Sequence, residues 1–362
     1  MAYKHLNTQA NAIMLEEDDR ARGDWNRRPH FVMYDKTALL LEKVKWIYEQ
    51  TGIMRSLAED ELYDVESLSI VGDTGTGKST FCRFFQSMFP RKNVGDKDII
   101  PLIHAKLKSH VAGLTGFYTT LLEPYGNPIV DPDNGLKAPV KLAHLHEMVK
   151  HHIRKAGTRI IFIDEFQHVF ESRKKGIITN QVIINQLKLL MEEARVAIIP
   201  VGVLSVESFL NLDAQLAGRC PVKDYSRLES WEFPELNEGI DLEKEIRRVQ
   251  KFYPLFPPAE LKKKIEKRVA ELQVENKQKR ERFRNLLKGF ESNMAFPEPS
   301  YLSSPDNSAL IFAKVRFTRA EEGDLQKANI RRIAWFLRKA SILAHGRNHR
   351  RIEVDDLNDT IL

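Results

Sequence analysis

The 362-residue sequence has little cysteine: only Cys82 and Cys220 occur. Two isolated cysteines make neither a zinc motif nor a disulfide framework, so we expect a protein of a reducing cytoplasm. No apolar run approaches the roughly 18 residues that a membrane-spanning helix needs. The first residues, MAYKHLN, also lack the hydrophobic region of a secretory signal. These absences predict a cytoplasmic protein that has no membrane partner.

Zinc-protease spacing is absent as well, although four histidines gather at His144, His146, His151 and His152. The run from His146 to His151 misses the HExxH spacing by one residue, and two ligands five residues apart do not share a helix face. We therefore expect an amphipathic helix with surface histidines rather than a metal site.

The net charge of +6 has a single source. The segment from Glu260 to Lys288 contains 11 Lys or Arg and 5 Asp or Glu, and this difference of +6 equals the whole excess. Such a segment is compatible with nucleic acid binding, but a solvated helix face is the commoner explanation.

The most informative segment fits the phosphate-loop pattern GxxxxGK[ST], and its residues are Gly72, Asp73, Thr74, Gly75, Thr76, Gly77, Lys78 and Ser79. The run Leu68-Ser69-Ile70-Val71 before it predicts a short buried strand, and residues 80–85 predict the first turns of a helix. In that context the backbone N–H groups of the loop, continuing to Thr80, surround phosphate oxygens. The alternative is a Gly/Thr-rich turn without a ligand.

Two side chains of this loop have predicted roles. Lys78 would bring its positive charge to the β- and γ-phosphates, and the hydroxyl of Ser79 would bind Mg²⁺. The sequence therefore predicts ATP and Mg²⁺ as cofactors.

A second motif reduces the weight of the ligand-free alternative. The apolar run 160–163 predicts a strand buried on both faces of a parallel sheet, and Asp164 and Glu165 follow at its carboxyl end. Asp164 would hold Mg²⁺, directly or through water, and Glu165 would polarise the water that attacks the γ-phosphate. Taken alone, the acidic pair is also compatible with an ordinary core strand.

Three parts of the chain differ in pattern, and together they predict an α/β fold with a parallel sheet flanked by helices. Residues 1–60 form a polar N-terminal extension and a helix. Residues 61–235 alternate strands and helices, with further strands at 99–103 and 197–203. Residues 236–362 show only helical patterns, which we interpret as a helical lid.

These features together resemble AAA+ P-loop NTPases and, more closely, the TniB/TnsC ATPases that regulate DNA transposition. Of the further matching motifs, the DxQLxxR segment from Asp213 to Arg219 is the most specific. The others are Arg28-Pro29-His30, the FYxx(I/L)L helix from Phe117 to Leu122, Phe166 to Val169 after the acidic pair, Trp231, and the run from Phe290 to Leu302. The resemblance covers most of the chain.

The resemblance implies roles for two arginines. Arg219 would be offered to the γ-phosphate of the neighbouring subunit, and a planar guanidinium suits phosphate oxygens. Arg331 would be the lid residue that senses nucleotide, with Arg332 as the alternative. A surface arginine at a helix end remains the other interpretation of Arg219.

The chain departs from the family pattern in two places. Val203 stands where the family usually has threonine, so a polar sensor must come from elsewhere, for example Ser205, and we expect hydrolysis to be slow. A charged helical insertion at about 242–282 adds to the lid.

The resemblance implies an ATP-dependent regulator of transposition that assembles with copies of itself, as a ring or helical filament, on duplex DNA. It would connect a target-selection protein of TniQ/TnsD type to a transposase. Contacts to DNA should be mostly to phosphates. The candidate residues are Lys106, Lys108, Lys137 and Lys141, and a solvated lysine is the alternative for each.

Two other functions stay open. One is an AAA+ motor of replication or secretion type, and the other is an ATP-binding adaptor that does not hydrolyse. The intact Asp164–Glu165 pair disfavours the adaptor, whereas Val203 favours weak turnover.

Overall fold

The computed structural model describes residues 31–57, 65–108, 113–127, 130–131, 135–136, 140–170, 177–228, 230–231, 258–318 and 326–360. The described chain forms two compact units: an α/β unit from Asp35 to Leu228, and a helical unit of residues 31–34 together with those from Ser230 onward. Three elements of the sequence interpretation lie outside the described residues: the Arg28-Pro29-His30 segment, Lys137, and residues 242–257 of the predicted insertion.

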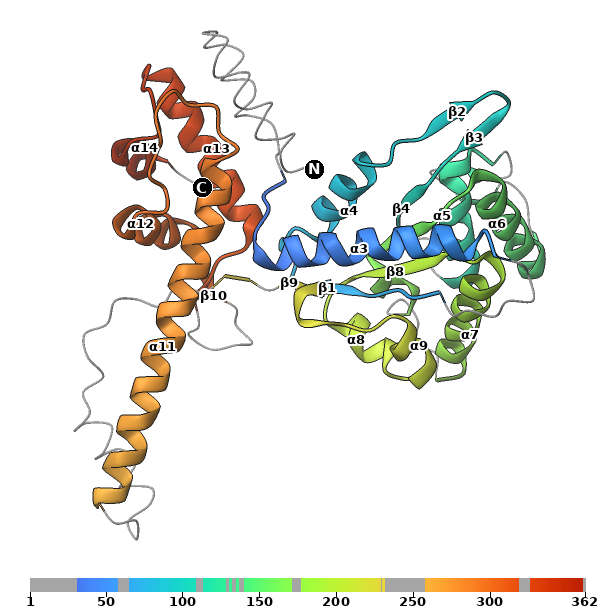
Figure 1. The fold of residues 1–362 in the computed structure, drawn as a ribbon, viewed down its shortest axis with the longest axis horizontal. Coiled ribbons are helices and arrows are strands. Elements are labelled where there is room, and N and C mark those ends of the chain that lie inside the picture. The colour runs from blue at the N-terminus through green and yellow to red at the C-terminus, as the bar shows by residue number, and fades with distance from the viewer. Residues whose placement is uncertain are drawn as a thin grey trace. The chain divides into compact units, whose positions relative to one another are not determined.

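The main sheet of the α/β unit has five strands, all parallel (Figure 1). Their order is β4 (Leu102–Lys106), β7 (Ile160–Asp164), β8 (Ala197–Gly202), β1 (Ile70–Gly72) and β9 (Arg227–Leu228). Strand β8 thus lies between β1, which ends in Gly72 of the phosphate loop, and β7, which ends in Asp164 of the acidic pair. The predicted parallel sheet flanked by helices is confirmed.

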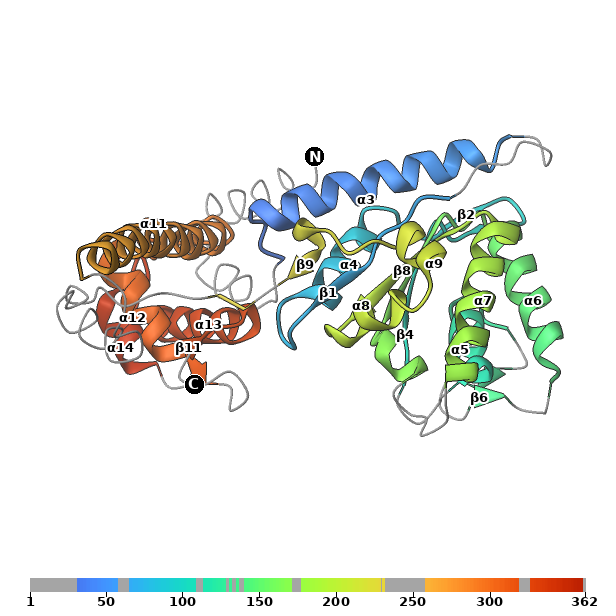
Figure 2. The ribbon, with the colours of Figure 1, turned by 90° about the horizontal axis from the view of Figure 1, so that it is seen from below.

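The residues of β7 alternate between two layers of helices. Ile161 and Ile163 belong to the hydrophobic core formed with α5 (Gly113–Leu122), α6 (Leu142–Ala156) and α7 (Ile177–Ala194). Phe162 instead contacts Phe85 of α4 (Lys78–Ser87), with ring centroids 5.8 Å apart. Helix α3 (Asp35–Met54) packs beside the end of α4 (Figure 2). Burial on both faces explains why this strand is continuously apolar.

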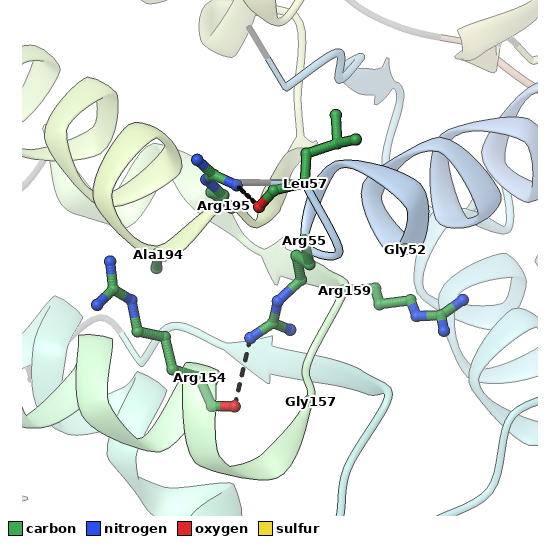
Figure 3. Close-up of a pocket in the computed structure, with 8 residues that line it drawn as sticks. All are labelled: Gly52, Arg55, Leu57, Arg154, Gly157, Arg159, Ala194 and Arg195. Carbon is green, nitrogen blue, oxygen red and sulfur yellow. Dashed lines mark hydrogen bonds between the residues drawn. The ribbon is translucent and has the colours of Figure 1, made fainter. Parts of the chain in front are cut away.

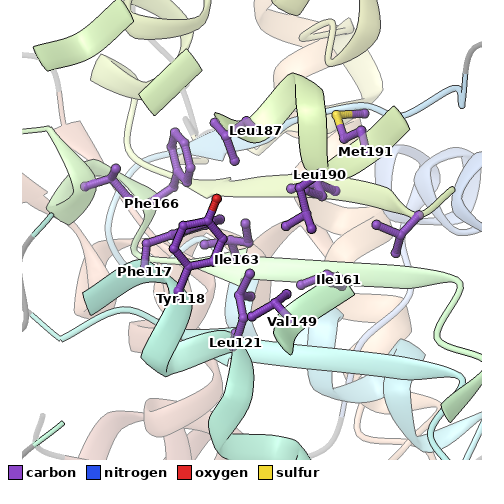
Figure 4. Close-up of a cluster of buried hydrophobic side chains, with 14 of the residues drawn as sticks. Phe117, Tyr118, Leu121, Val149, Ile161, Ile163, Phe166, Leu187, Leu190 and Met191 are labelled. Carbon is purple, nitrogen blue, oxygen red and sulfur yellow. The ribbon is translucent and has the colours of Figure 1, made fainter. Parts of the chain in front are cut away.

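The FYxx(I/L)L segment lies in this core (Figure 4). Phe117, Tyr118 and Leu121 of α5 are buried against Val149 of α6 and Ile161 of β7. Full burial of one such side chain contributes about 1.5–3 kcal/mol. The segment that carries part of the family resemblance is therefore a packing element of the sheet.

Short elements complete the α/β unit. They are the hairpin strands β2 (Lys92–Val94) and β3 (Lys97–Ile99), the turn η1 (Glu123–Tyr125), the pair β5 (Val130–Asp131) and β6 (Gly135–Leu136), η2 (Phe166–Val169), α8 (Ser205–Leu210), α9 (Ala214–Arg219) and η3 (Asp224–Ser226). The strand predicted at 99–103 is wrong in its start, because β4 begins at Leu102. Pro101 has no N–H for a strand ladder, which accounts for the break between β3 and β4.

Among its described residues, the helical unit has four helices and a two-stranded hairpin. Its elements are α11 (Pro258–Glu291), α12 (Pro305–Val315), β10 (Phe317–Thr318), β11 (Gln326–Lys327), α13 (Ile330–Gly346) and α14 (Val354–Asp359). The side chains of Ser304 and Asn329 cap α12 and α13 by accepting backbone N–H bonds. None of the helices that the structure describes combines the length and apolar character needed to cross a lipid bilayer.

Helix α11 contains the described part of the predicted charged insertion. From 262 to 282 no side chain is buried, whereas Phe283, Leu286, Leu287 and Phe290 are buried in the core of the helical unit. The charged segment is therefore the outer part of a continuous helix whose last turns are core residues (Figure 1).

Candidate functional site

The phosphate-loop segment joins β1 to α4 with a backbone that requires glycine. A Cβ on Gly72 would lie 1.8 Å from the carbonyl oxygen of Leu228 in β9, so no side chain fits there. Gly77 caps α4 with φ at 93°, a left-handed conformation that glycine adopts without strain. These two residues let the chain turn directly from the buried strand into the N-terminus of the helix.

Lys78 is the first residue of α4 and is only 9% exposed. Its Nζ donates to the carbonyl oxygens of Gly72, at 2.8 Å, and Asp73, at 2.7 Å. The Thr76 hydroxyl donates to the same Asp73 carbonyl at 2.8 Å. The ammonium group is therefore held inside the loop, where a triphosphate can replace these carbonyls as its partner.

Asp164 ends β7 and is 1% exposed. Its Oδ2 lies 3.1 Å from Nε2 of His104 on β4, its Oδ1 accepts the Glu165 backbone N–H at 3.0 Å, and the Ser79 hydroxyl donates to the carboxylate. Burial alone would raise the pKa of Asp164, but the bonds from His104 and Ser79 outweigh it and lower the pKa below its usual value. An ionised Asp164 beside the Ser79 hydroxyl fits the oxygen ligands that Mg²⁺ prefers.

Glu165 follows with an unusual backbone, because its φ of 57° is left-handed for a residue that is not glycine. Such conformations cost roughly 1–3 kcal/mol and concentrate at functional sites. Its Oε2 accepts a hydrogen bond from Nε2 of Gln167 at 2.7 Å. The carboxylate is thereby oriented by a neighbour two residues further along the chain.

Gln167 is a site residue that the sequence did not reveal. It is 6% exposed, and its Oε1 has no hydrogen-bond partner among the residues that the structure describes. A Cβ on Gly202, the last residue of β8, would lie 2.5 Å from that oxygen. The Gln167 amide therefore lies at the carboxyl end of β8, next to Val203, whose side chain is not polar. Ser205, the other candidate for a polar sensor, is the first residue of α8. Its position after the acidic pair was visible in the sequence, but the direction of its side chain was not.

Arg219 does not join this group. It ends α9, and its carbonyl oxygen accepts from the amide of Ser67, which precedes β1. The phosphate loop lies at the other end of β1. The guanidinium lies 3.8 Å from the carboxylate of Glu192 on α7. Within the DxQLxxR segment, Asp213 caps α9 by accepting the Leu216 N–H at 2.8 Å.

The remaining candidates lie on several elements. Lys106 ends β4 opposite Asp164 and is exposed, and Lys141 is exposed at the start of α6. Lys108 is half-buried. In the helical unit, Arg331 is exposed on the first turn of α13 and Arg332 is half-buried.

The histidine segment forms α6, but the prediction that all four histidines lie on the surface is wrong for His146. His146 is 5% exposed; its Nδ1 lies 2.8 Å from the Tyr118 hydroxyl and its Nε2 lies 3.1 Å from Glu193. His146, Glu147 and Glu193 offer atoms within 4.8 Å of one another. The Lys150 ammonium already contacts both carboxylates, at 2.7 and 2.9 Å, so this group is an internal ion-pair network.

Comparison with known proteins identifies the family. The model of the family described as bacterial TniB protein matches residues 22–232, which is more than half of the chain. The chain belongs to the TniB family. The predicted resemblance is thus confirmed, and the match contains the phosphate loop, the acidic pair and Arg219.

Solved structures give a more distant likeness. The Aeropyrum pernix ORC2 protein in its ADP form is 13% identical, with 94% of this chain and 71% of that chain covered and a TM-score of 0.46. The Aeropyrum pernix ORC1 protein in complex with DNA is 15% identical, covering 92% and 67%, with a TM-score of 0.45. The Thermotoga maritima RuvB branch migration motor is 10% identical, covering 92% and 71%, with a TM-score of 0.35. No curated protein sequence matches this TniB-family chain.

Proposed function

We propose that this TniB-family protein is an ATPase that assembles on duplex DNA in an ATP-dependent manner and regulates transposition. The observation that carries the proposal is the convergence of Lys78, Ser79, Asp164 and Glu165 at the carboxyl edge of one parallel sheet. Family membership supports the transposition role. The expected partners are a second copy of the chain, duplex DNA, a target-selection protein of TniQ/TnsD type and a transposase.

In this proposal each group at the sheet edge has one task. The loop N–H groups and Lys78 bind the phosphates, and Ser79 and Asp164 hold Mg²⁺, whose chemistry is to neutralise charge that develops on the phosphoryl oxygens. Glu165 orients and deprotonates the attacking water, and Gln167 holds the Glu165 carboxylate in place. Arg331 would sense the nucleotide from the helical unit, and Lys106, Lys108, Lys137 and Lys141 would contact DNA phosphates.

Two measurements separate this proposal from its alternatives. ATPase activity that rises on addition of duplex DNA, together with rings or filaments on DNA in electron micrographs with an ATP analogue, would support it. Steady turnover by assemblies that form equally well without DNA would favour an AAA+ motor of replication or secretion type. Nucleotide binding with no turnover would favour a non-hydrolysing adaptor.

We predict that Arg219→Ala leaves ATP binding by the monomer intact but removes assembly-dependent hydrolysis. The reason is that Arg219 lies at the opposite end of β1 from its own phosphate loop, so its target would be on another subunit. Loss of one guanidinium from a phosphoryl-transfer site costs about 10³-fold or more in kcat. Turnover measured with and without DNA tests this. The matched control is Lys223→Ala, which removes an exposed cation four residues further along the chain.

Mixing variants tests whether Arg219 acts on a neighbour. Each Arg219→Ala subunit retains its Glu165, and each Glu165→Gln subunit retains its Arg219. Mixed assemblies therefore contain some complete sites, and we expect part of the activity to return. If the two proteins co-assemble and no activity returns, the assignment of Arg219 to the neighbouring site is wrong.

We also predict that DNA binding requires ATP or a non-hydrolysable analogue, depends on duplex length more than on sequence, and weakens steeply with salt. Each neutralised phosphate adds about 0.9 to the slope of log affinity against log salt. Assembly multiplies the few contacts of each subunit along the duplex. Tight, nucleotide-independent binding to one short sequence would contradict the assembly proposal.

Deletion of residues 242–282 tests whether the outer part of α11 belongs to the DNA-binding surface of the protein. The deletion ends before the buried residues Phe283, Leu286, Leu287 and Phe290, so these core residues are retained. If the exposed basic residues contact DNA, the salt slope falls. An unchanged slope would assign this segment to a protein partner or to solvent.

A further inference from the structure

The α/β unit contains a basic pocket of about 450 Å³ (Figure 3). Its described lining comes from the end of α3 and the residues after it, the end of α6, the residue before β7 and the end of α7. The described lining residues are Gly52, Arg55, Leu57, Arg154, Gly157, Arg159, Ala194 and Arg195. Four of these eight residues are arginines, and none is acidic. A hollow with this lining has a positive potential that favours an anion.

The pocket is separate from the phosphate loop. Arg159 directly precedes β7, whereas Asp164 is the last residue of the same strand. Five residues of strand span about 17 Å, so the two features lie at opposite edges of the parallel sheet. An anion in this pocket is therefore not the triphosphate that Lys78 would hold.

Backbone carbonyls orient three of the arginines. Arg55 donates to the carbonyl oxygen of Ile153, at 3.0 Å, and to that of Thr158. Arg195 donates to the carbonyl oxygen of Met54 at 3.0 Å, and Arg154 to that of Glu193 at 2.6 Å. These carbonyls lie at or near the C-terminal ends of helices, where a cation is favourable. The bonds hold the guanidinium groups in place but supply no full negative charge.

Within the described chain, three of these arginines have no carboxylate partner. No ion pair of Arg55, Arg154 or Arg159 forms there, whereas Arg91 pairs with Asp98, and Arg227 pairs with Glu207 at 2.6 Å. The guanidinium of Arg159 extends past Gly52 and lies over the ring of Tyr48, 4.7 Å from its centroid. Burial is the main cause that lowers the pKa of Arg55; Tyr125 opposes this shift, and the nearby Arg159 and Arg154 add smaller lowering effects. The cluster thus concentrates like charges that a bound anion would relieve.

We propose that this pocket binds a phosphate-bearing anion, either a free polyphosphate or a phosphate of the DNA backbone. A guanidinium donates two parallel N–H bonds to phosphate oxygens and stays charged at every accessible pH, so arginine suits this ligand better than lysine does. The site differs from both the phosphate loop and the lysines proposed to contact DNA, and it does not depend on ATP hydrolysis.

The test uses the full chain carrying Lys78→Ala, so that the phosphate loop contributes little. Inorganic tripolyphosphate is titrated without divalent cations, and binding is measured by calorimetry. We expect one site per chain, weakened at least about tenfold by Arg154→Gln with Arg159→Gln, since two charged donors are lost. The control, Arg91→Gln with Lys97→Gln, removes the same charge from the exposed β2–β3 hairpin and should change affinity less than about twofold.

Unfolding temperatures show whether the variants are folded. Arg154→Gln alone, at an exposed side chain, replaces the double variant if that one is unstable. A second titration with a short DNA duplex identifies the source of the phosphate: the arginine substitutions weaken duplex binding only if the pocket takes the DNA backbone. Absence of tripolyphosphate binding, or equal losses in the arginine and control variants, would overturn the proposal.

A separate variant tests competition by acidic residues of the chain itself. Glu59, Asp60 and Glu61 follow Leu57 closely in sequence and lie outside the described residues. Their replacement by the corresponding amides should leave tripolyphosphate binding in place or tighten it. Binding that occurs only after this replacement would assign the pocket to these acids and would also overturn the proposal.

Discussion

Replacement of Lys78 by alanine is expected to abolish saturable ATP binding and, with it, stable assembly on DNA. Lys78 is the cation of the phosphate loop, and its ammonium group is already positioned there by the carbonyls of Gly72 and Asp73. A hydrogen bond to a charged group contributes about 1.5–3 kcal/mol, and loss of two corresponds to at least about a 100-fold lower affinity. Equilibrium titration with a fluorescent ATP analogue measures this.

The control for this variant is Lys92→Ala, which removes an exposed lysine from the β2–β3 hairpin of the same unit. It should bind ATP with unchanged affinity. An unfolding curve shows whether Lys78→Ala is folded, because Nζ also bonds the carbonyls of its own loop. Normal affinity in a folded Lys78→Ala protein would refute the assignment of the nucleotide site.

Glu165→Gln is expected to keep ATP binding and lose hydrolysis, by about 10²–10⁴-fold as for removal of a general base. The amide has the shape of the carboxylate, so Asp164 and Ser79 keep their geometry, and Gln167 can still donate to the oxygen at position 165. Assemblies on DNA should then persist longer. Single-turnover hydrolysis with a separate measurement of ATP affinity tests both parts.

Gln167→Leu is the matched comparison for this prediction. It keeps the Glu165 carboxylate but removes the bond that orients it, so we expect a smaller loss of kcat than in Glu165→Gln, with ATP affinity retained. A wild-type hydrolysis rate in Glu165→Gln would show that another residue activates water.

The fold was predictable where the local pattern determines it. The run 160–163 before Asp164 is short and apolar and lies in β7, and of the run 68–71 before the phosphate loop Ile70 and Val71 lie in β1, which starts two residues later than predicted. The start of β4 was missed because the apolar run 99–103 contains Pro101, whose effect on the strand ladder depends on its partner strand. The predicted insertion at about 242–282 stays a prediction; its described part continues without a break into the buried turns after Phe283, because both parts follow the same helical period.

The sequence predicted the phosphate loop and the charged residues of the candidate site, but not all of the residues that contact them. Lys78, Ser79 and Asp164 follow from spacing, because a strand, a loop and a helix bring them to one edge of the sheet. His104 and Gln167 reach Asp164 and Glu165 through the pairing of β4 with β7 and through a left-handed turn at Glu165. Neither relation is encoded by a local motif, so the sequence alone did not identify them.

Helix α11 has a geometric consequence of its own. Its 34 residues are continuous, and its last turns are fixed in a hydrophobic core. Any residue inserted or deleted between 262 and 282 therefore turns the outer end of the helix by about 100° and shifts it by about 1.5 Å. The direction in which an exposed basic residue points around the helix axis therefore depends on how many residues separate it from Phe283. Insertions or deletions of three or four residues change this direction less than those of one or two.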